Sequence, residues 1–264
     1  MNEFSLALLV ALTGWWFSTG VILWLVHRPV AQHRLIFACS SLVMLLAFWG
    51  MTALVGEWSP QSVVMAFCLA LLLWGWLEMG YLMGFITGPH KEECPAGVPA
   101  RTRIRLGLGT CLWHELTLLA MVFALAALSL NQPNQVALWT FTVLWLMRWS
   151  SKLNLVLGVR NYNRSWLPSH LAYLDSYIPK RPFNVLFPLS LGFGLAATYL
   201  LIDGAVQTSD LNVMIALALV GTLAALGTLE HIFLMAPMGD AALWLWAAPD
   251  EVPVQGAAES GSQP

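Results

Sequence analysis

The chain has 264 residues, of which 58% are hydrophobic and only 10% are charged, and its mean hydropathy is +0.70. Soluble domains carry about 25% charged residues, so this composition excludes an ordinary soluble protein and indicates an integral membrane protein. The formal net charge of −2 gives no sign of nucleic-acid binding, and the four cysteines have neither disulfide-framework nor zinc-site spacing.

Seven apolar runs, separated by polar or Pro/Gly-rich stretches, predict about seven transmembrane helices in an all-α polytopic membrane protein. The runs are expected at roughly 5–26, 35–55, 61–86, 108–130, 135–157, 183–203 and 212–236. The first run lacks a basic leader and a cleavage site, so we expect it to be retained as a helix. The turn Asn131-Gln-Pro-Asn-Gln predicts that the fourth and fifth helices form a hairpin.

The longest polar insert, Gly158–Asn184, follows the fifth helix. Pro168 and Ser169 can begin a short helix in which Leu171 and Leu174 share one face. We therefore predict an amphipathic helix at the cytoplasmic interface between the fifth and sixth helices, where its basic flanks favour anionic lipid.

The C-terminal end changes in composition. A short stretch carrying Trp244 and Trp246 is expected at the membrane interface. From residue 249 the chain is rich in Gly, Ala, Ser, Pro and acidic residues. The sequence thus predicts a single membrane-embedded domain, 1–248, and a disordered cytoplasmic tail, 249–264.

Positive charge alternates between the predicted loops. All 12 Lys and Arg residues fall in or beside the first, third and fifth loops: Arg28, Arg34, Lys91, Arg101, Arg103, Arg105, Arg148, Lys152, Arg160, Arg164, Lys180 and Arg181. The even loops carry only the acids Glu57, Asp203 and Asp210. Positively charged loops stay in the cytoplasm, so the N-terminus is expected outside and the C-terminus in the cytoplasm.

Five ionisable residues lie inside apolar helices: Glu78, His114, Glu115, Glu230 and His231. Such residues are costly in lipid, so they usually face the protein interior, have partners and mark function. Counted from the predicted cytoplasmic helix ends, Glu78 lies about 12 Å deep, His114-Glu115 about 10 Å and Glu230-His231 about 9 Å. Because three helices place these residues in one slab, the sequence predicts a buried polar cluster that holds a ligand or a metal.

Three interpretations of this cluster stay open. Its carboxylates and imidazoles suit iron, manganese or zinc, although the Glu-x-x-His spacing of di-iron bundles is absent. It could instead be an ion-pair layer, in which Arg148 and Lys152 share a face of the fifth helix and offset two glutamates. The third interpretation is a polar pocket for a ligand or a partner helix, with Asn154 and His170 near its cytoplasmic mouth.

Several motifs resemble one family. They are Trp113-His114-Glu115-Leu, Lys152-Leu-Asn154-Leu-Val-Leu-Gly158-Val-Arg-Asn, Leu167-Pro-Ser-His170-Leu-Ala-Tyr173-Leu-Asp-Ser-Tyr177 and Arg181-Pro-Phe-Asn184-Val-Leu-Phe-Pro188-Leu-Ser190. With the chain length, they resemble the PuhE family of photosynthetic complex assembly proteins in purple phototrophic bacteria. The resemblance covers roughly residues 70–235. It implies a multi-pass bacterial inner-membrane protein, needed for efficient assembly of the reaction centre and core antenna, with an influence on bacteriochlorophyll supply. It brings no established catalytic or ligand residues.

The expected function is therefore an assembly factor with no known catalytic role, although an enzyme stays open. Its expected partners are the lipid bilayer, reaction-centre and core-antenna subunits, and other assembly factors. One hypothesis is that the cluster transiently holds bacteriochlorophyll or a precursor, with His114 or His231 as magnesium ligand. The alternative is a membrane metalloenzyme acting on a tetrapyrrole or isoprenoid. A transporter is a third class, which the missing inverted repeat counts against.

Overall fold

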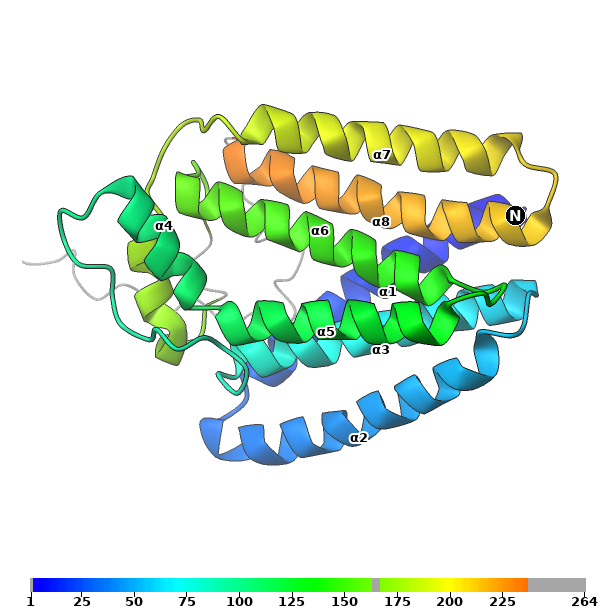
Figure 1. Ribbon diagram of the computed structural model, residues 1–264, viewed down its shortest axis with the longest axis horizontal. Coiled ribbons are helices and arrows are strands. Elements are labelled where there is room, and N and C mark those ends of the chain that lie inside the picture. The colour runs from blue at the N-terminus through cyan, green and yellow to red at the C-terminus, as the bar shows by residue number, and fades with distance from the viewer. Residues whose placement is uncertain (1, 163–166, 237–264) are drawn as a thin grey trace, which may run out of the picture.

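The computed structural model of the protein describes residues 2–162 and 167–236. Its regular elements are helices, in the order α1 (Glu3–Val26), α2 (Val30–Leu54), α3 (Pro60–Leu82), α4 (Ala100–Gly109), α5 (Leu112–Ser129), α6 (Val136–Leu157), η2 (Ser169–Tyr177), α7 (Phe187–Gln207) and α8 (Leu211–Met235). The long helices lie roughly side by side and alternate in direction, and α4 and η2 lie together at one end (Figure 1).

Six of these helices are long and apolar enough to cross a membrane: α1, α2, α3, α5, α7 and α8. The prediction of an all-helical, multi-pass membrane protein is thus confirmed at the level of its class. α6 has 22 residues but is not in that set, and it carries Arg148, Lys152 and several other polar residues. A seventh span and the outside N-terminus stay predictions.

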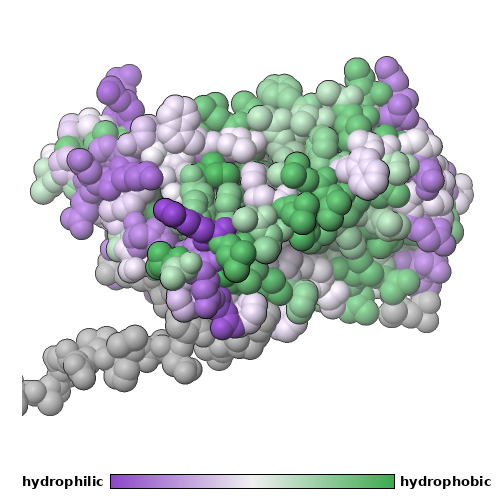
Figure 2. Space-filling model, turned by 90° about the horizontal axis from the view of Figure 1, so that it is seen from below, coloured by the Kyte–Doolittle hydropathy of each residue, from purple (hydrophilic) through white to green (hydrophobic). Residues whose placement is uncertain are grey.

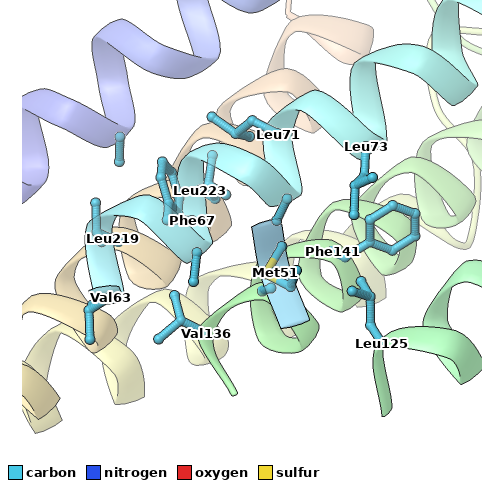
Figure 3. Close-up of a cluster of buried hydrophobic side chains, with 14 of the residues drawn as sticks. Met51, Val63, Phe67, Leu71, Leu73, Leu125, Val136, Phe141, Leu219 and Leu223 are labelled. Carbon is cyan, nitrogen blue, oxygen red and sulfur yellow. The ribbon is translucent and has the colours of Figure 1, made fainter. Parts of the chain in front are cut away.

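The centre of the bundle is formed by α3 and α8, each of which has 56% of its most apolar stretch buried. Phe67 of α3 and Leu219 of α8 are fully buried there, with Phe141 of α6 and Leu125 of α5 on another side of α3 (Figure 3). α2 and α7 have only 11% of the equivalent stretch buried. On the face seen in Figure 2, apolar side chains are most frequent away from the two ends, and hydrophilic ones gather toward the ends.

Two glycines let α8 approach its neighbours closely. A Cβ atom on Gly194 of α7 would lie 2.4 Å from Thr228 Oγ1, and one on Gly227 of α8 would lie 2.8 Å from Met147 Cγ of α6. Both distances are shorter than any real contact, so a larger residue would push the helices apart. Small residues at helix crossings replace hydrophobic burial as the source of tight packing in a membrane.

Two predicted helix boundaries at the end of the bundle that carries α4 and η2 were wrong. The third helix was expected to reach residue 86, but α3 ends at Leu82, and Gly84 has a φ of +82°. The fourth was expected to begin at 108, but Leu108 lies in α4, and the chain breaks at Thr110 and Cys111 before α5 begins at Leu112. A Cβ on Gly88 would lie 2.0 Å from the Gly109 carbonyl oxygen, so the preceding loop packs directly against this break.

The second and sixth predicted helices also begin at other residues than expected. α2 begins at Val30, directly after Pro29, instead of at 35. α7 begins at Phe187 instead of 183, because Asn184 Oδ1 accepts hydrogen bonds from the Leu186 and Phe187 N–H groups, at 3.0 Å each. This asparagine therefore caps the start of α7 from outside the helix.

The amphipathic segment is the 3₁₀ helix η2, which buries Leu171 and Tyr177. Its Tyr177 hydroxyl donates to the Glu92 carbonyl over 2.9 Å, so η2 is held against the loop before α4. The interfacial stretch with Trp244 and Trp246 and the tail 249–264 lie outside the described residues.

Candidate functional site

The polar residues of the interior are organised around α6. Toward its end this helix carries Arg148, Ser150, Lys152 and Asn154. Positions 148 and 152 are four residues apart and so share a helix face, while 150 and 154 share another. α6 therefore presents two cations to one side of the bundle and two neutral polar groups to another.

The first ion pair joins α6 to α3. Arg148 Nη2 lies 3.1 Å from Glu78 Oε2, and Glu78 is buried. His114 of α5 is fully buried, with its Nε2 atom 3.6 Å from Glu78 Oε1. Glu78 thus lies between a guanidinium from one helix and an imidazole from another.

The second ion pair joins α6 to α5. Lys152 Nζ lies 2.5 Å from Glu115 Oε1, and both side chains are largely buried. The same ammonium lies 4.9 Å from the centre of the Tyr81 ring, which in turn lies 4.7 Å from the His114 ring. Tyr81 therefore contacts both His114 and Lys152 and gives the cation an aromatic face.

His231 belongs to a separate hydrogen-bonded group. Its Nδ1 atom lies 2.6 Å from the Gly227 carbonyl and its Nε2 atom 2.9 Å from Ser150 Oγ. Ser150 Oγ is also hydrogen-bonded to Ser190 Oγ of α7 at 2.9 Å, and Ser190 Oγ accepts from Asn154 Nδ2 at 3.0 Å. Both ring nitrogens of His231 are occupied, so this group ties α6, α7 and α8 together.

The two remaining predicted residues lie at the margins. Glu230 is half-buried and interacts electrostatically with Arg148. His170 lies on η2, outside the helix bundle, where its Nε2–H can donate to the Leu82 carbonyl over 2.9 Å. Burial lowers the pKa of His170, as do the nearby charges of His33 and Lys91. His170 therefore covers the end of α3 and takes no part in the ion pairs.

Several buried side-chain atoms in and beside the two ion pairs lack hydrogen bonds. Within the described part of the chain, neither ring nitrogen of His114 has a hydrogen-bond partner, nor do Glu78 Oε1, Glu115 Oε2 and Asn154 Oδ1. Most buried polar atoms are hydrogen-bonded to protein or to ordered water. His114 and the two carboxylates therefore retain hydrogen-bonding capacity that the described side chains do not use.

Metal ligation is less well supported. No group of three His, Cys, Asp or Glu side chains among residues 2–162 and 167–236 is arranged to hold a metal ion. The carboxylates at 78 and 115 have cationic partners instead. The layer can hold charge and protons, but its donors do not form a coordination sphere.

The sequence did not single out Tyr81, Ser150 or Ser190, although each contacts a predicted residue. Tyr81 follows Glu78 by three positions and so lies on the same face of α3, which is a signal that the sequence contains. The two serines offer no such signal, because serine is common in membrane helices. Only packing identifies them.

Fold and site together define an all-helical, multi-pass membrane protein whose polar helix α6 is ion-paired to two neighbours. The chain belongs to the family described as protein of unknown function DUF3623, which matches residues 1–255. It is 34% identical, over 268 residues, to an uncharacterized 30.4 kDa protein in the puhA 5′ region of Rhodobacter capsulatus. That similarity covers 100% of this chain and 97% of the relative. No solved structure matches the chain.

Proposed function

We propose that this protein is an assembly factor for the photosynthetic reaction centre and its core antenna in a bacterial inner membrane. The observation that carries the proposal is its full-length similarity to the protein in the puhA 5′ region of Rhodobacter capsulatus. The resemblance of its motifs to the PuhE family supports the same conclusion.

The outer helices suit a protein that works beside other membrane proteins. α2 and α7 expose most of their apolar surface, including Trp49 at 73%, Leu189 at 69% and Phe193 at 65% exposure. In a bilayer such faces contact lipid or the helices of a neighbour. Subunits of the photosynthetic complexes, or other assembly factors, are the partners that we propose for these faces.

The ion-pair layer supplies the framework for this role. Without water, an isolated charge inside the membrane is costly, so each pair holds its helices in one arrangement. Arg148–Glu78 joins α6 to α3, and Lys152–Glu115 joins α6 to α5. These two contacts support the interpretation of the cluster as an ion-pair layer, and that interpretation does not require a bound cofactor.

Pigment handling is a narrower hypothesis. An axial magnesium ligand needs a ring nitrogen without another partner and an open face for the macrocycle. His231 uses both nitrogens in hydrogen bonds. His114 has no hydrogen bond at either nitrogen but is fully buried and covered by Tyr81. The geometry does not fit a bound macrocycle, and no step of the proposed role passes through one.

The assembly role is tested by deleting the gene in its phototrophic host. We expect lower absorption from assembled reaction centres and core antenna in isolated membranes, with restoration by the wild-type gene. Tagged protein should also co-purify with subunits of these complexes. Normal complex levels in the deletion strain would contradict the proposal.

The pigment hypothesis has its own measurement. Protein purified from pigment-producing cells would be examined by absorption spectroscopy, beside His114→Ala and His231→Ala variants. Pigment that is present in stoichiometric amount and is lost only with His114→Ala would support it. Absence of pigment, or pigment unaffected by both variants, would discard it and leave the assembly role intact.

A further inference from the structure

Three cations converge on the segment that follows α6. Arg160, Lys180 and Arg181, together with Pro182, line an open pocket of about 340 Å³. All three side chains are exposed, and none has an acidic partner within 4.0 Å among the described residues. This pocket is separate from the ion-pair layer, whose cations already have carboxylate partners.

The backbone beneath these cations is held in place. Val159 N–H donates to the Pro179 carbonyl over 3.1 Å, and Arg181 N–H donates to the Val159 carbonyl over 2.9 Å. Arg160 N–H donates to the Leu234 carbonyl near the end of α8 over 3.1 Å. The two halves of the pocket, which are distant in sequence, are therefore fixed to each other and to the helix bundle.

The stem of Arg181 is also confined. Gly158 has a φ of +115°, and a Cβ atom there would lie 2.7 Å from Arg181 Cδ. Glycine at 158 thus leaves room for the arginine stem to pass across the backbone.

The location defines the class of ligand. The pocket lies beyond the end of α6 and next to the end of α8, at the end of the bundle that also carries α4 and η2 (Figure 1). This is the level at which lipid headgroups meet a membrane protein. Arginine binds phosphate oxygens through paired N–H donors, and lysine adds a point charge.

We propose that Arg160, Lys180 and Arg181 form a binding site for the phosphate of an anionic phospholipid headgroup. A soluble phosphate compound offers the same chemistry, but the pocket lies at an end of the apolar bundle, where a surrounding bilayer would place its headgroups. The competing explanation is diffuse attraction, in which these residues act only as part of the general positive charge at this end.

The test uses the full-length protein in detergent, with bound lipids counted by native mass spectrometry during titration. The probes are short-chain phosphatidylglycerol, short-chain phosphatidylcholine and inorganic phosphate. We expect one phosphatidylglycerol to bind more tightly than either of the others. Equal affinity for the two lipids would overturn the site, and phosphate binding as tightly as phosphatidylglycerol would overturn the lipid as its ligand.

Two triple variants remove the same charge from different places. Arg160→Gln/Lys180→Gln/Arg181→Gln should weaken phosphatidylglycerol binding at least tenfold, since each cation contributes roughly fivefold. Lys91→Gln/Arg101→Gln/Arg105→Gln, at exposed positions outside the pocket, should change it by less than about twofold. Equal losses in both variants would show diffuse attraction and overturn the proposal.

A single substitution serves as a control for misfolding of the triple variant. Arg160→Gln keeps the backbone hydrogen bond to Leu234, so the fold should be retained. We expect it alone to weaken binding by roughly fivefold. Unchanged affinity in this variant, with the helical circular dichroism of the wild type, would overturn the role of Arg160 and with it the three-cation site.

Discussion

Arg148 and Lys152 stand on one face of α6, and each reaches a carboxylate from a different helix. Arg148 contacts Glu78 of α3 at 3.1 Å, and Lys152 contacts Glu115 of α5 at 2.5 Å. Each carboxylate would be costly to bury alone, and so would each cation. The four residues therefore depend on each other, and the three helices that carry them are held in a single arrangement.

Removal of one charge of a pair should destabilise the protein, because the other charge is left without its partner. Glu78→Gln removes the charge that Arg148 faces, so we expect a loss of about 2 kcal/mol in the free energy of unfolding. The double variant Glu78→Gln/Arg148→Gln should lose less than the sum of the two single variants. Unfolding would be followed in mixed detergent micelles by circular dichroism.

A matched control for this cycle is Glu57→Gln. Glu57 is exposed in the loop between α2 and α3 and has no cation partner among the described ion pairs. Its loss should change the free energy of unfolding by less than about 0.5 kcal/mol. Strict additivity of the Glu78 and Arg148 effects would contradict a direct interaction between them.

At the scale of elements, the start of α7 is defined by a residue outside the helix. Asn184 Oδ1 accepts from two N–H groups at that start, and its Nδ2 donates to the Gly158 carbonyl over 2.8 Å. This one side chain therefore joins α7 to the end of α6. The predicted boundary at 183 was wrong because apolar composition does not reveal which polar residue caps a helix.

Asn184→Ala should cost about 1 to 2 kcal/mol of stability, because it leaves the helix start without its acceptor. Asn184→Asp keeps that acceptor but loses the amide that donates to Gly158, so its effect should be smaller. Both would be measured as the free energy of unfolding in micelles. A larger loss for the aspartate than for the alanine would contradict the capping role.

The element η2 should respond to pH through His170. The pKa of this histidine is lower in the folded protein than its ordinary value of about 6.5. When the pH is below that ordinary value, unfolding is therefore accompanied by the uptake of a proton. The docking of η2 is therefore expected to be complete at neutral pH and to weaken as the pH falls through the folded pKa.

This response can be measured by hydrogen exchange of peptides from 169–177, corrected for the intrinsic effect of pH. Exchange should rise between pH 7.5 and pH 5.5 in the wild type and change less in His170→Gln. Equal pH dependence in the two proteins would exclude His170 as its source.

At the scale of the whole molecule, helices that alternate in direction place the basic loops at one end. Arg28, Lys91, Arg101 and Lys180 lie in connections at the end with α4 and η2, whereas Glu57 and Asp210 lie in connections at the other (Figure 1). Such asymmetry orients a membrane protein with its basic loops inside the cell. A crossing by α6, despite its two cations, is required for this alternation.

Topology reporters would test the orientation and the seventh span together. A fluorescent protein inserted after Pro133 should be dark and a periplasmic phosphatase there active, because that turn is expected outside. Insertions after Gly97 or Pro182 should give the opposite result. The same side for Pro133 and Pro182 would show that α6 does not cross the membrane.

The class of this protein could be predicted from the chain alone, because helix length and apolar composition are local properties. The sequence also predicted similar depths for the ionisable residues, because depth is counted in residues along a helix. Burial of Glu78, His114 and His231 agrees with the cost of charge in lipid. None of these inferences depends on which helices pack against each other.

Only the tertiary structure decided the partners. Rotation of a helix by one residue, about 100°, turns a side chain toward a different neighbour, and nothing local in the sequence sets that rotation. His114 and His231 looked equivalent in sequence, yet one lies beside Glu78 and the other is hydrogen-bonded to Gly227 and Ser150. The rotation of each helix depends on how its whole surface packs against its neighbours, including close contacts such as those at Gly194 and Gly227.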